Sequence, residues 1–176
     1  MKKLFLFTVI ILFGFLQFPL AGTGEKYKGA VTHSKEFERM KELAGDWEGT
    51  TDMGKGLVTI KATYELTSGG SAILERLFVG SPEEMVTVYY DFNGTLTMTH
   101  YCMLGNQPHM KLKNAGERYV EFILSENNHG LASLNESYMH GLKISFDGKD
   151  SITHTWVLYE EGKRKSDTVI KLSRVI

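Results

Sequence analysis

The sequence predicts an all-β fold, an up-and-down antiparallel β-barrel of about ten strands with a short N-terminal helix. Polar and apolar residues alternate along most of the chain after Gly45, which is the period of a half-buried strand. Turn residues interrupt this alternation about every ten residues, as in hairpins that join sequential strands. Because such strands would otherwise expose their edges, we expect the sheet to close on itself.

Each expected element follows from a local pattern. Ser34 is the expected N-cap of a helix of about two to three turns, in which Phe37, Met40 and Leu43 recur at helical spacing. Strands are expected near 47–53, 56–67, 71–79, 84–91, 95–102, 108–113, 118–124, 136–146, 151–159 and 164–174. The breaks between them include Ser68-Gly-Gly70, Asn93-Gly94, Gly105-Asn-Gln-Pro108 and Asp147-Gly148.

Length and charge narrow the class of protein. The chain has 176 residues and a net charge of −1, from 20 basic and 21 acidic residues. This length suits one domain with a single core. The charge balance lacks the positive excess on which nucleic-acid binding and polybasic membrane patches depend. We therefore expect no nucleic-acid partner.

Residues 1–24 are predicted to be a secretory signal. Two lysines, Lys2 and Lys3, precede a charge-free apolar stretch over 4–16, and small residues follow at 21–24. An uncleaved N-terminal anchor is the alternative. We expect a bacterial periplasmic or secreted protein without stable membrane insertion after signal cleavage.

The rest of the chain is expected to hold one barrel domain. Residues 25–34 are expected to form a polar, mobile leader, and residues 35–176 the barrel itself. The chain contains one cysteine, Cys102, so it has no intrachain disulfide. The hydrophobic core must therefore hold the fold together.

Alternation within the strands indicates which side chains face the barrel interior. In four strands the even-numbered residues form the inward set: Val58, Ile60, Ala62, Tyr64 and Leu66; Leu96, Met98, His100 and Cys102; Tyr138, His140, Leu142, Ile144 and Phe146; Ile152, His154, Trp156 and Leu158. Polar side chains thus lie inside at His100, Cys102, His140 and His154. His109 alternates with lysines and is expected outside. The direction of Glu75 stays open, because apolar and charged residues occur on both faces of its strand.

The turn at 91–94 decides which residues of the preceding strand face inward. A type I turn followed by a glycine bulge would pair His100 with Val86 and place Val86, Val88 and Tyr90 inside. A two-residue Asn93-Gly94 turn would instead place Met85, Thr87 and Tyr89 inside. We expect the bulge, because its interior is more apolar.

The inward polar residues and their apolar neighbours predict a ligand cavity. Barrels of this size often enclose one, and a small, partly apolar molecule is the expected partner. Its expected lining is Tyr64, Met98, His100, Cys102, His140, His154 and Trp156. This interpretation needs no cofactor.

Two alternatives use the same side chains. The first is a metal- or haem-binding protein with ligands among His100, Cys102, His140 and His154. The hairpin at Asp147-Gly148 does not place His140 directly opposite His154, so the spacing does not single out a metal. The second is an enzyme acting on a small hydrophobic substrate with a histidine as acid or base.

Two features bear on the enzyme alternative. In such an enzyme Cys102 and His100 would form a thiolate–imidazolium pair. The alternative interpretation of Cys102 is a buried, unreactive thiol. The polar loop 125–136 is either a lid over a barrel mouth or a plain surface loop.

Gly45-Asp-Trp47, after a short helix, resembles the Gly-x-Trp signature that opens the first strand of lipocalins and other calycins. In that superfamily the tryptophan closes one barrel end and packs against a basic residue of the last strand. The resemblance assigns these structural positions to Trp47 and Arg174.

A longer resemblance covers nearly all of 36–174. The segments "LAGDWEGT", "TSGGSAILERLF", "EMVTVYY", "THYCMLGNQPHM" and "YMHGLKISF" are similar to an exported bacterial family of uncharacterised calycin-like proteins. The resemblance implies the fold and no established activity. Nitrobindins are similar in architecture and bind haem through an interior histidine, but the C-terminal "KSDTVIKLSRVI" departs from their haem-ligand segment.

Overall fold

The computed structural model describes residues 32–52, 54 and 56–176. The predicted signal and residues 25–31 of the predicted leader lie outside the described residues. The end of that leader contacts the barrel: the Ser34 side chain donates to Asp91 at 2.7 Å, and the His33 ring lies 4.5 Å from that of Phe37.

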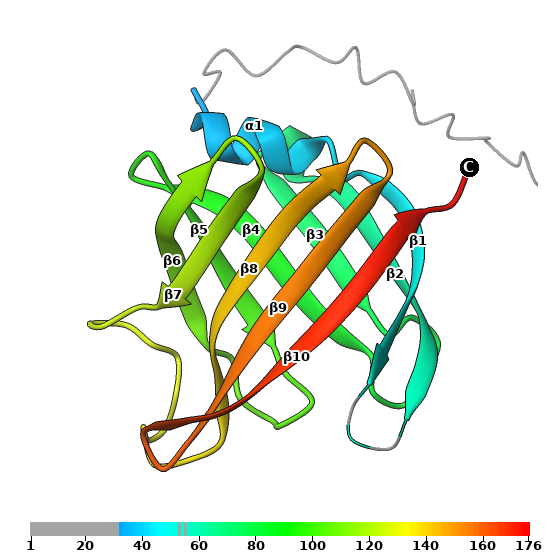
Figure 1. Cartoon of the computed structure of the whole chain (residues 1–176). Coiled ribbons are helices and arrows are strands. Elements are labelled where there is room, and N and C mark those ends of the chain that lie inside the picture. The colour runs from blue at the N-terminus through cyan, green and yellow to red at the C-terminus, as the bar shows by residue number, and fades with distance from the viewer. Residues whose placement is uncertain (1–31, 53, 55) are drawn as a thin grey trace, which may run out of the picture. The chain divides into compact units, whose positions relative to one another are not determined.

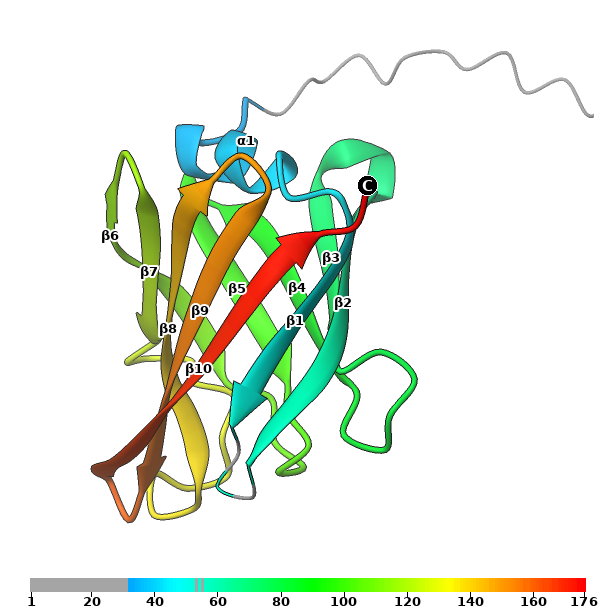
Figure 2. The same ribbon diagram turned by 45° about the vertical axis from the view of Figure 1, so that its right-hand side comes forward.

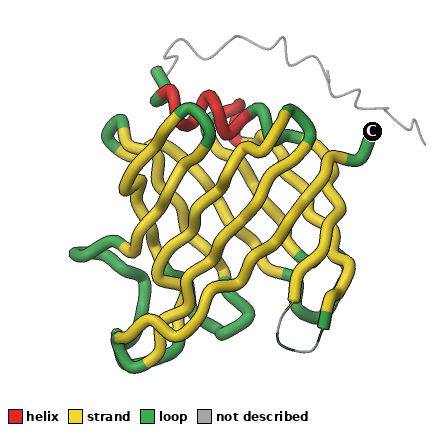
Figure 3. The backbone as a smooth tube through the Cα atoms, in the orientation of Figure 1, coloured by secondary structure: helices red, strands yellow, loops and turns green. Residues whose placement is uncertain are grey.

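The described chain is a closed barrel with one helix at one end (Figures 1 and 3). Every strand pairs antiparallel with its neighbours in sequence, and the first pairs with the last, which confirms the predicted fold class. The elements in order are α1 (Lys35–Lys41), β1 (Gly45–Asp52), β2 (Leu57–Thr67), the 3-10 turn Ser68–Gly70, β3 (Ala72–Leu77), β4 (Met85–Phe92), β5 (Thr95–Tyr101), β6 (His109–Gly116), β7 (Tyr119–Leu124), β8 (Tyr138–Gly148), β9 (Ser151–Glu160) and β10 (Lys163–Arg174).

Helix α1 covers one end of the barrel (Figure 2). Ser34 is its N-cap, as predicted, and its hydroxyl accepts a hydrogen bond from the Phe37 amide at 3.1 Å. Phe37, Met40 and Leu43 are buried and join the barrel core. We call the opposite end, with the loops that follow β1, β3, β5, β7 and β9, the mouth.

The turn between β4 and β5 differs from the expected one. Asn93 and Gly94 form a two-residue turn with φ values of 51° and 76°, the positive values that match the right-handed twist of a hairpin. This register pairs Thr87 with His100 and buries Met85, Thr87 and Tyr89. The expected bulge is wrong, because the hydroxyls of Thr87 and Tyr89 have hydrogen-bond partners inside the barrel.

A bulge in β8 overturns a second expectation. Met139 pairs with Leu158 and Gly141 with Val157, so His140 is the extra residue between two ladder pairs. His140 therefore does not share the inward face of Leu142. The inward set of β2 is also shorter than expected, because Val58 and Leu66 at its two ends are 43% and 39% exposed.

No helix among the described residues is long and apolar enough to span a membrane.

Candidate functional site

The mouth of the barrel contains a cavity of about 450 Å³. Its inner wall is mostly apolar and includes Leu77, Met85, His100, Met139, Trp156 and Ile170. Residues of the β1–β2 and β5–β6 loops and the first half of β10 form its rim. This cavity holds two of the predicted ligand-binding residues, His100 and Trp156.

His100 and Trp156 are the polar side chains of the inner cavity wall, whereas Asp52, Ser166, Asp167 and Thr168 lie nearer its rim. Their ring centroids lie 4.4 Å apart. His100 Nδ1 is hydrogen-bonded to the Thr87 hydroxyl at 2.9 Å. His100 Nε2 and Trp156 Nε1 are both buried, and neither has a hydrogen-bond partner within the described part of the chain. Burial lowers the pKa of His100 to about 3, so its imidazole is neutral at physiological pH.

A buried cluster of polar side chains lies deeper in the barrel. The Glu75 carboxylate accepts hydrogen bonds from the hydroxyls of Tyr64, at 3.0 Å, and Tyr89, at 2.7 Å. Because Tyr64 donates to Glu75, the Nε2–H of His154 donates to the Tyr64 oxygen, 2.8 Å away. His154 Nδ1 lies 3.6 Å from Glu75. Glu75 and His154 are completely buried.

The electrostatics of this cluster follow from burial and one negative charge. Burial and the Glu75 carboxylate raise the pKa values of Tyr64 and Tyr89 well above their usual range, so both phenols keep their protons. Burial lowers the pKa of His154, and Glu75 opposes this shift. The cluster is therefore a charge held by neutral donors. It does not line the mouth cavity.

Sequence reasoning missed part of this arrangement. The alternation leaves the direction of Glu75 open, and the expected bulge places Thr87 and Tyr89 outside. The Asn93-Gly94 pair carried the signal, because this dipeptide strongly favours a two-residue hairpin turn. In that register Thr87 lies between Glu75 and His100 in the sheet.

Three other predicted lining residues lie away from the mouth cavity. Met98 is fully buried in the core. Cys102 is buried at the β5–β6 turn, and burial raises the pKa of its thiol, which makes it less reactive. His140 stacks on Tyr159, with centroids 3.8 Å apart, in a groove that also contains Lys113.

The four predicted metal ligands do not come together. His100 lines the cavity, whereas His154 Nε2 is bonded to Tyr64 and the other two lie elsewhere. Over residues 32–52, 54 and 56–176, no group of three or more His, Cys, Asp or Glu side chains is arranged to hold a metal ion. The loop 125–136 contributes none of the described residues around the mouth cavity.

Arg174 packs on Trp47 at the end covered by α1. The guanidinium lies 4.4 Å from the Trp47 ring centroid and donates to the Ala44 and Glu42 carbonyls at 2.6 and 2.7 Å. It also pairs with Asp150 at 3.2 Å. These contacts join α1, β1 and β10.

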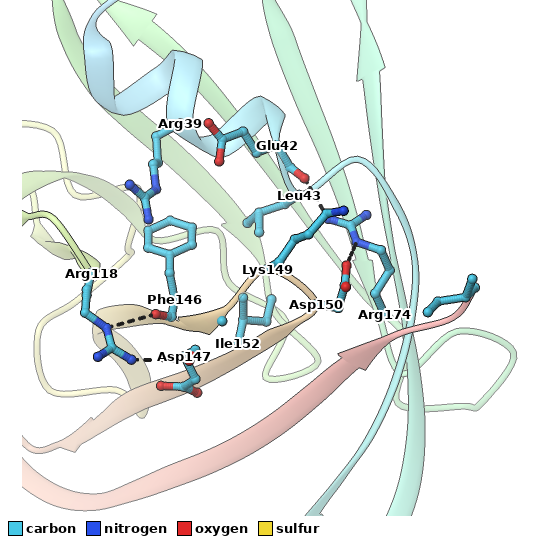
Figure 4. A pocket seen from close by; sticks show the side chains of 12 residues that line it. Arg39, Glu42, Leu43, Arg118, Phe146, Asp147, Lys149, Asp150, Ile152 and Arg174 are labelled. Carbon is cyan, nitrogen blue, oxygen red and sulfur yellow. Dashed lines mark hydrogen bonds and ion pairs between the residues drawn. The ribbon is translucent and has the colours of Figure 1, made fainter.

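A wider cleft of about 1040 Å³ lies beside this contact (Figure 4). Arg118 donates to the Phe146 and Asp147 carbonyls there, and Arg39 lies over the Phe146 ring at 4.3 Å. Most of its cationic groups thus already hold the helix and hairpins together. The mouth cavity is the better candidate, because its inner wall is mostly apolar and includes two rings that each carry a buried polar atom without a partner in the described chain.

Comparisons with known proteins support the fold. No protein-family model matches the chain, and no curated protein sequence is similar to it. The chain resembles the structure of a protein of unknown function from the DUF3598 family of Nostoc punctiforme, with a TM-score of 0.52 and 11% identity. The match covers 77% of this chain and 49% of that protein, so the chain spans about half of its length. The likeness shows a shared barrel fold.

Proposed function

We propose that this protein binds a small, partly apolar organic molecule in the mouth cavity. The observation that carries the proposal is the pair of unpartnered buried atoms, His100 Nε2 and Trp156 Nε1, in the wall of an apolar space. Ligand sites are typically apolar cavities of about 300–1,000 Å³ with a few polar groups that orient the ligand. The mouth cavity, at about 450 Å³, has both properties.

Binding has more support than catalysis. A histidine whose pKa is about 3 is a weak base near neutral pH. The Cys102 thiol, whose pKa burial raises, is a poor nucleophile. The proposed role is therefore to hold and shield a molecule rather than to transform it.

Haem is a second candidate ligand, and one observation favours it. His100 has its Nδ1 held by Thr87, while Nε2 has no partner among the described side chains. An axial histidine has the same arrangement, in which a hydrogen bond to one nitrogen orients the other. An absorption spectrum of the purified protein distinguishes this candidate from a colourless organic ligand.

We also propose that the chain is an exported, calycin-like bacterial protein, found in the periplasm or outside the cell. The charge and length of residues 1–24 support export, and the Trp47–Arg174 contact supports the calycin relationship. N-terminal sequencing of the protein recovered from its host tests export: we expect a start near residue 25. A protein that stays intact in the cytoplasm would contradict it.

The test of ligand binding uses two variants on one strand. Thr168 lines the cavity opposite Trp156 in the ladder, whereas its neighbour Val169 faces outward and is 44% exposed. Thr168→Trp should fill the cavity, and Val169→Trp is the matched control.

Each protein is purified from its native host and analysed by native mass spectrometry and absorption spectroscopy. We expect a stoichiometric small molecule on the wild type and on Val169→Trp, and its loss from folded Thr168→Trp. A Soret band would identify the ligand as haem. No bound molecule on any form, or equal retention by Thr168→Trp, would contradict binding in this cavity.

A further inference from the structure

The cleft beside the Trp47–Arg174 contact carries more positive charge than its own acidic side chains neutralise. It is lined by four cationic side chains, Arg39, Arg118, Lys149 and Arg174, and by three acidic ones, Glu42, Asp147 and Asp150. Arg174 pairs with Asp150 at 3.2 Å, and none of the other cations of the cleft forms an ion pair within the described residues. Arg39, Arg118 and Lys149 therefore keep uncompensated charges.

The guanidinium of Arg39 is held in place without a counter-ion. It lies over the Phe146 ring, 4.3 Å from the centroid. Its Nε is buried and has no hydrogen-bond partner within residues 32–52, 54 and 56–176. The acids Glu36 and Glu38 of the same helix pair with lysines instead. Because Arg39 is partly buried, its unpaired charge destabilises the fold, and pairing with an anion in the cleft would offset that effect.

Arg118 is positioned by the same aromatic residue. Its Nε donates to the Phe146 carbonyl at 3.5 Å, and its Nη2 donates to the Asp147 carbonyl at 3.2 Å. These carbonyls orient the guanidinium but carry no charge that would neutralise it. Figure 4 shows both arginine side chains next to Phe146, along one side of the cleft. Guanidinium groups held in this way match the planar, bidentate geometry of a carboxylate or a phosphate.

Apolar side chains lie beside this charge. Leu43, Phe146 and Ile152 line the cleft, and so does Ile176, whose side chain is fully exposed. A ligand for this cleft therefore needs an anionic head and an apolar body. The lining has an excess of one positive charge, which a carboxylate balances. A phosphate dianion would bring surplus negative charge toward the acids of the lining.

We propose that the cleft is a second ligand site, which binds a small amphiphilic carboxylate. The carboxylate accepts hydrogen bonds from the Arg39 guanidinium, and Arg118 contributes a second positive charge. The apolar chain lies on Leu43 and Ile176. This site is at the end covered by α1, opposite the mouth (Figure 1). It is therefore independent of the proposed function.

The test follows the Nε–H signals of the arginine side chains by NMR during titration with octanoate, and with 1-octanol as the neutral probe. Through-bond correlations assign the signals. We expect octanoate to shift the Arg39 signal to saturation at pH 6.5, and 1-octanol to leave it in place. Arg76 and Arg164 are internal controls, because they already pair with Glu84 and Asp167. Their signals should stay in place with both probes.

Two variants of α1 test the charge itself. Arg39→Met keeps an unbranched side chain over Phe146 and removes the charge. Lys35→Met removes the same charge from the same helix, but the Lys35 side chain is 91% exposed and is not among the described residues around the cleft. We expect Arg39→Met to bind octanoate about fivefold more weakly than Lys35→Met, as for a partly exposed ion pair. Glu42→Gln should tighten octanoate binding, because it removes an acid of the lining.

Several outcomes would overturn this second site. They are no movement of the Arg39 signal, equal movement with 1-octanol, or equal octanoate affinities of the two methionine variants. Tighter binding of inorganic phosphate than of octanoate would also overturn it, because the cleft would then recognise a bare anion and not an amphiphile. The comparison of octanoate with 1-octanol on the wild type is decisive even if Arg39→Met does not fold. None of these outcomes affects the mouth cavity, whose own test is the loss of a bound molecule from Thr168→Trp.

Discussion

His100 on β5 and Trp156 on β9 lie against each other with ring centroids 4.4 Å apart, although three strands separate them around the barrel wall. The contact therefore crosses the lumen. It joins two polar rings of the cavity wall that come from separated parts of the sheet.

Acid should destabilise the protein through His100. Its folded pKa, about 3, lies below the value of about 6.5 of an unfolded chain. Below pH 6.5 the His100 side chain binds a proton in the unfolded state but stays neutral in the folded state. Its contribution to the free energy of unfolding is therefore complete above this pH and is lost as pH falls toward 3. Urea unfolding should show a loss of about 2 kcal/mol between pH 7.5 and 5 from this residue.

The control is the same pair of urea titrations on His100→Phe. Its pH-dependent loss should be smaller than that of the wild type by about 2 kcal/mol. The remaining loss includes His154, whose pKa burial also lowers. Identical pH dependence in both proteins would contradict a neutral, buried His100.

Glu75→Leu should be strongly destabilising. It leaves the hydroxyls of Tyr64 and Tyr89 without their acceptor in a buried site, and each unsatisfied group costs about 1–3 kcal/mol. We expect the free energy of unfolding, measured in urea, to fall by about 2–6 kcal/mol.

The control removes the hydroxyls as well. In a Tyr64→Phe, Tyr89→Phe background, Glu75→Leu should cost far less or stabilise the protein, because it then removes a buried charge without donors. Additive effects of the three substitutions would show that the cluster is not coupled.

Gly49→Ala should disrupt the contact between β1 and β10. A Cβ atom at this position would lie 1.8 Å from the Lys171 carbonyl oxygen, which belongs to the backbone of the paired strand. The strands must separate to accept it, at a cost of more than about 3 kcal/mol. Gly148→Ala is the control, because no atom lies within 4 Å of its added Cβ. Thermal unfolding that ranks the two variants equally would contradict this close packing.

Arg174→Lys tests how the covered end is closed. Lysine keeps the charge but loses the planar group that lies over Trp47 and donates to two carbonyls. We expect the free energy of unfolding to fall by about 1–2 kcal/mol. Lys171→Arg, on the same strand, should change it by less than about 0.5 kcal/mol. No effect of Arg174→Lys would show that charge alone is sufficient.

Much of the fold follows from local patterns in the sequence. Ser34 caps α1, and the expected strands overlap all ten observed ones. These features depend on alternation and turn residues, which neighbouring residues specify. The errors concern which side chains face inward, and each comes from a strand register that differs from the expected one by a single residue. One extra residue at His140, and a turn one residue shorter at Asn93, each reverse which side chains face inward.

The candidate site was harder to predict because its contacts join distant strands. Alternation places His100 and Trp156 inside, but their contact depends on the diameter and stagger of the closed barrel. Choosing the register with the more apolar interior also places Thr87 and Tyr89 outside, because it assumes that polar side chains face outward. These residues are inside because Glu75 and His100 provide their hydrogen bonds.

The most direct test is an NMR titration of the two tryptophan indole N–H signals with 2-naphthol, assigned with Trp156→Phe. The chain has two tryptophans. Trp47 Nε1 already donates to the Leu43 carbonyl at 2.8 Å, whereas Trp156 Nε1 has no partner in the described structure. We predict that the Trp156 signal moves downfield to saturation and that the Trp47 signal stays in place. A Trp156 signal that does not move, or equal movement of both signals, would contradict ligand binding in the mouth cavity.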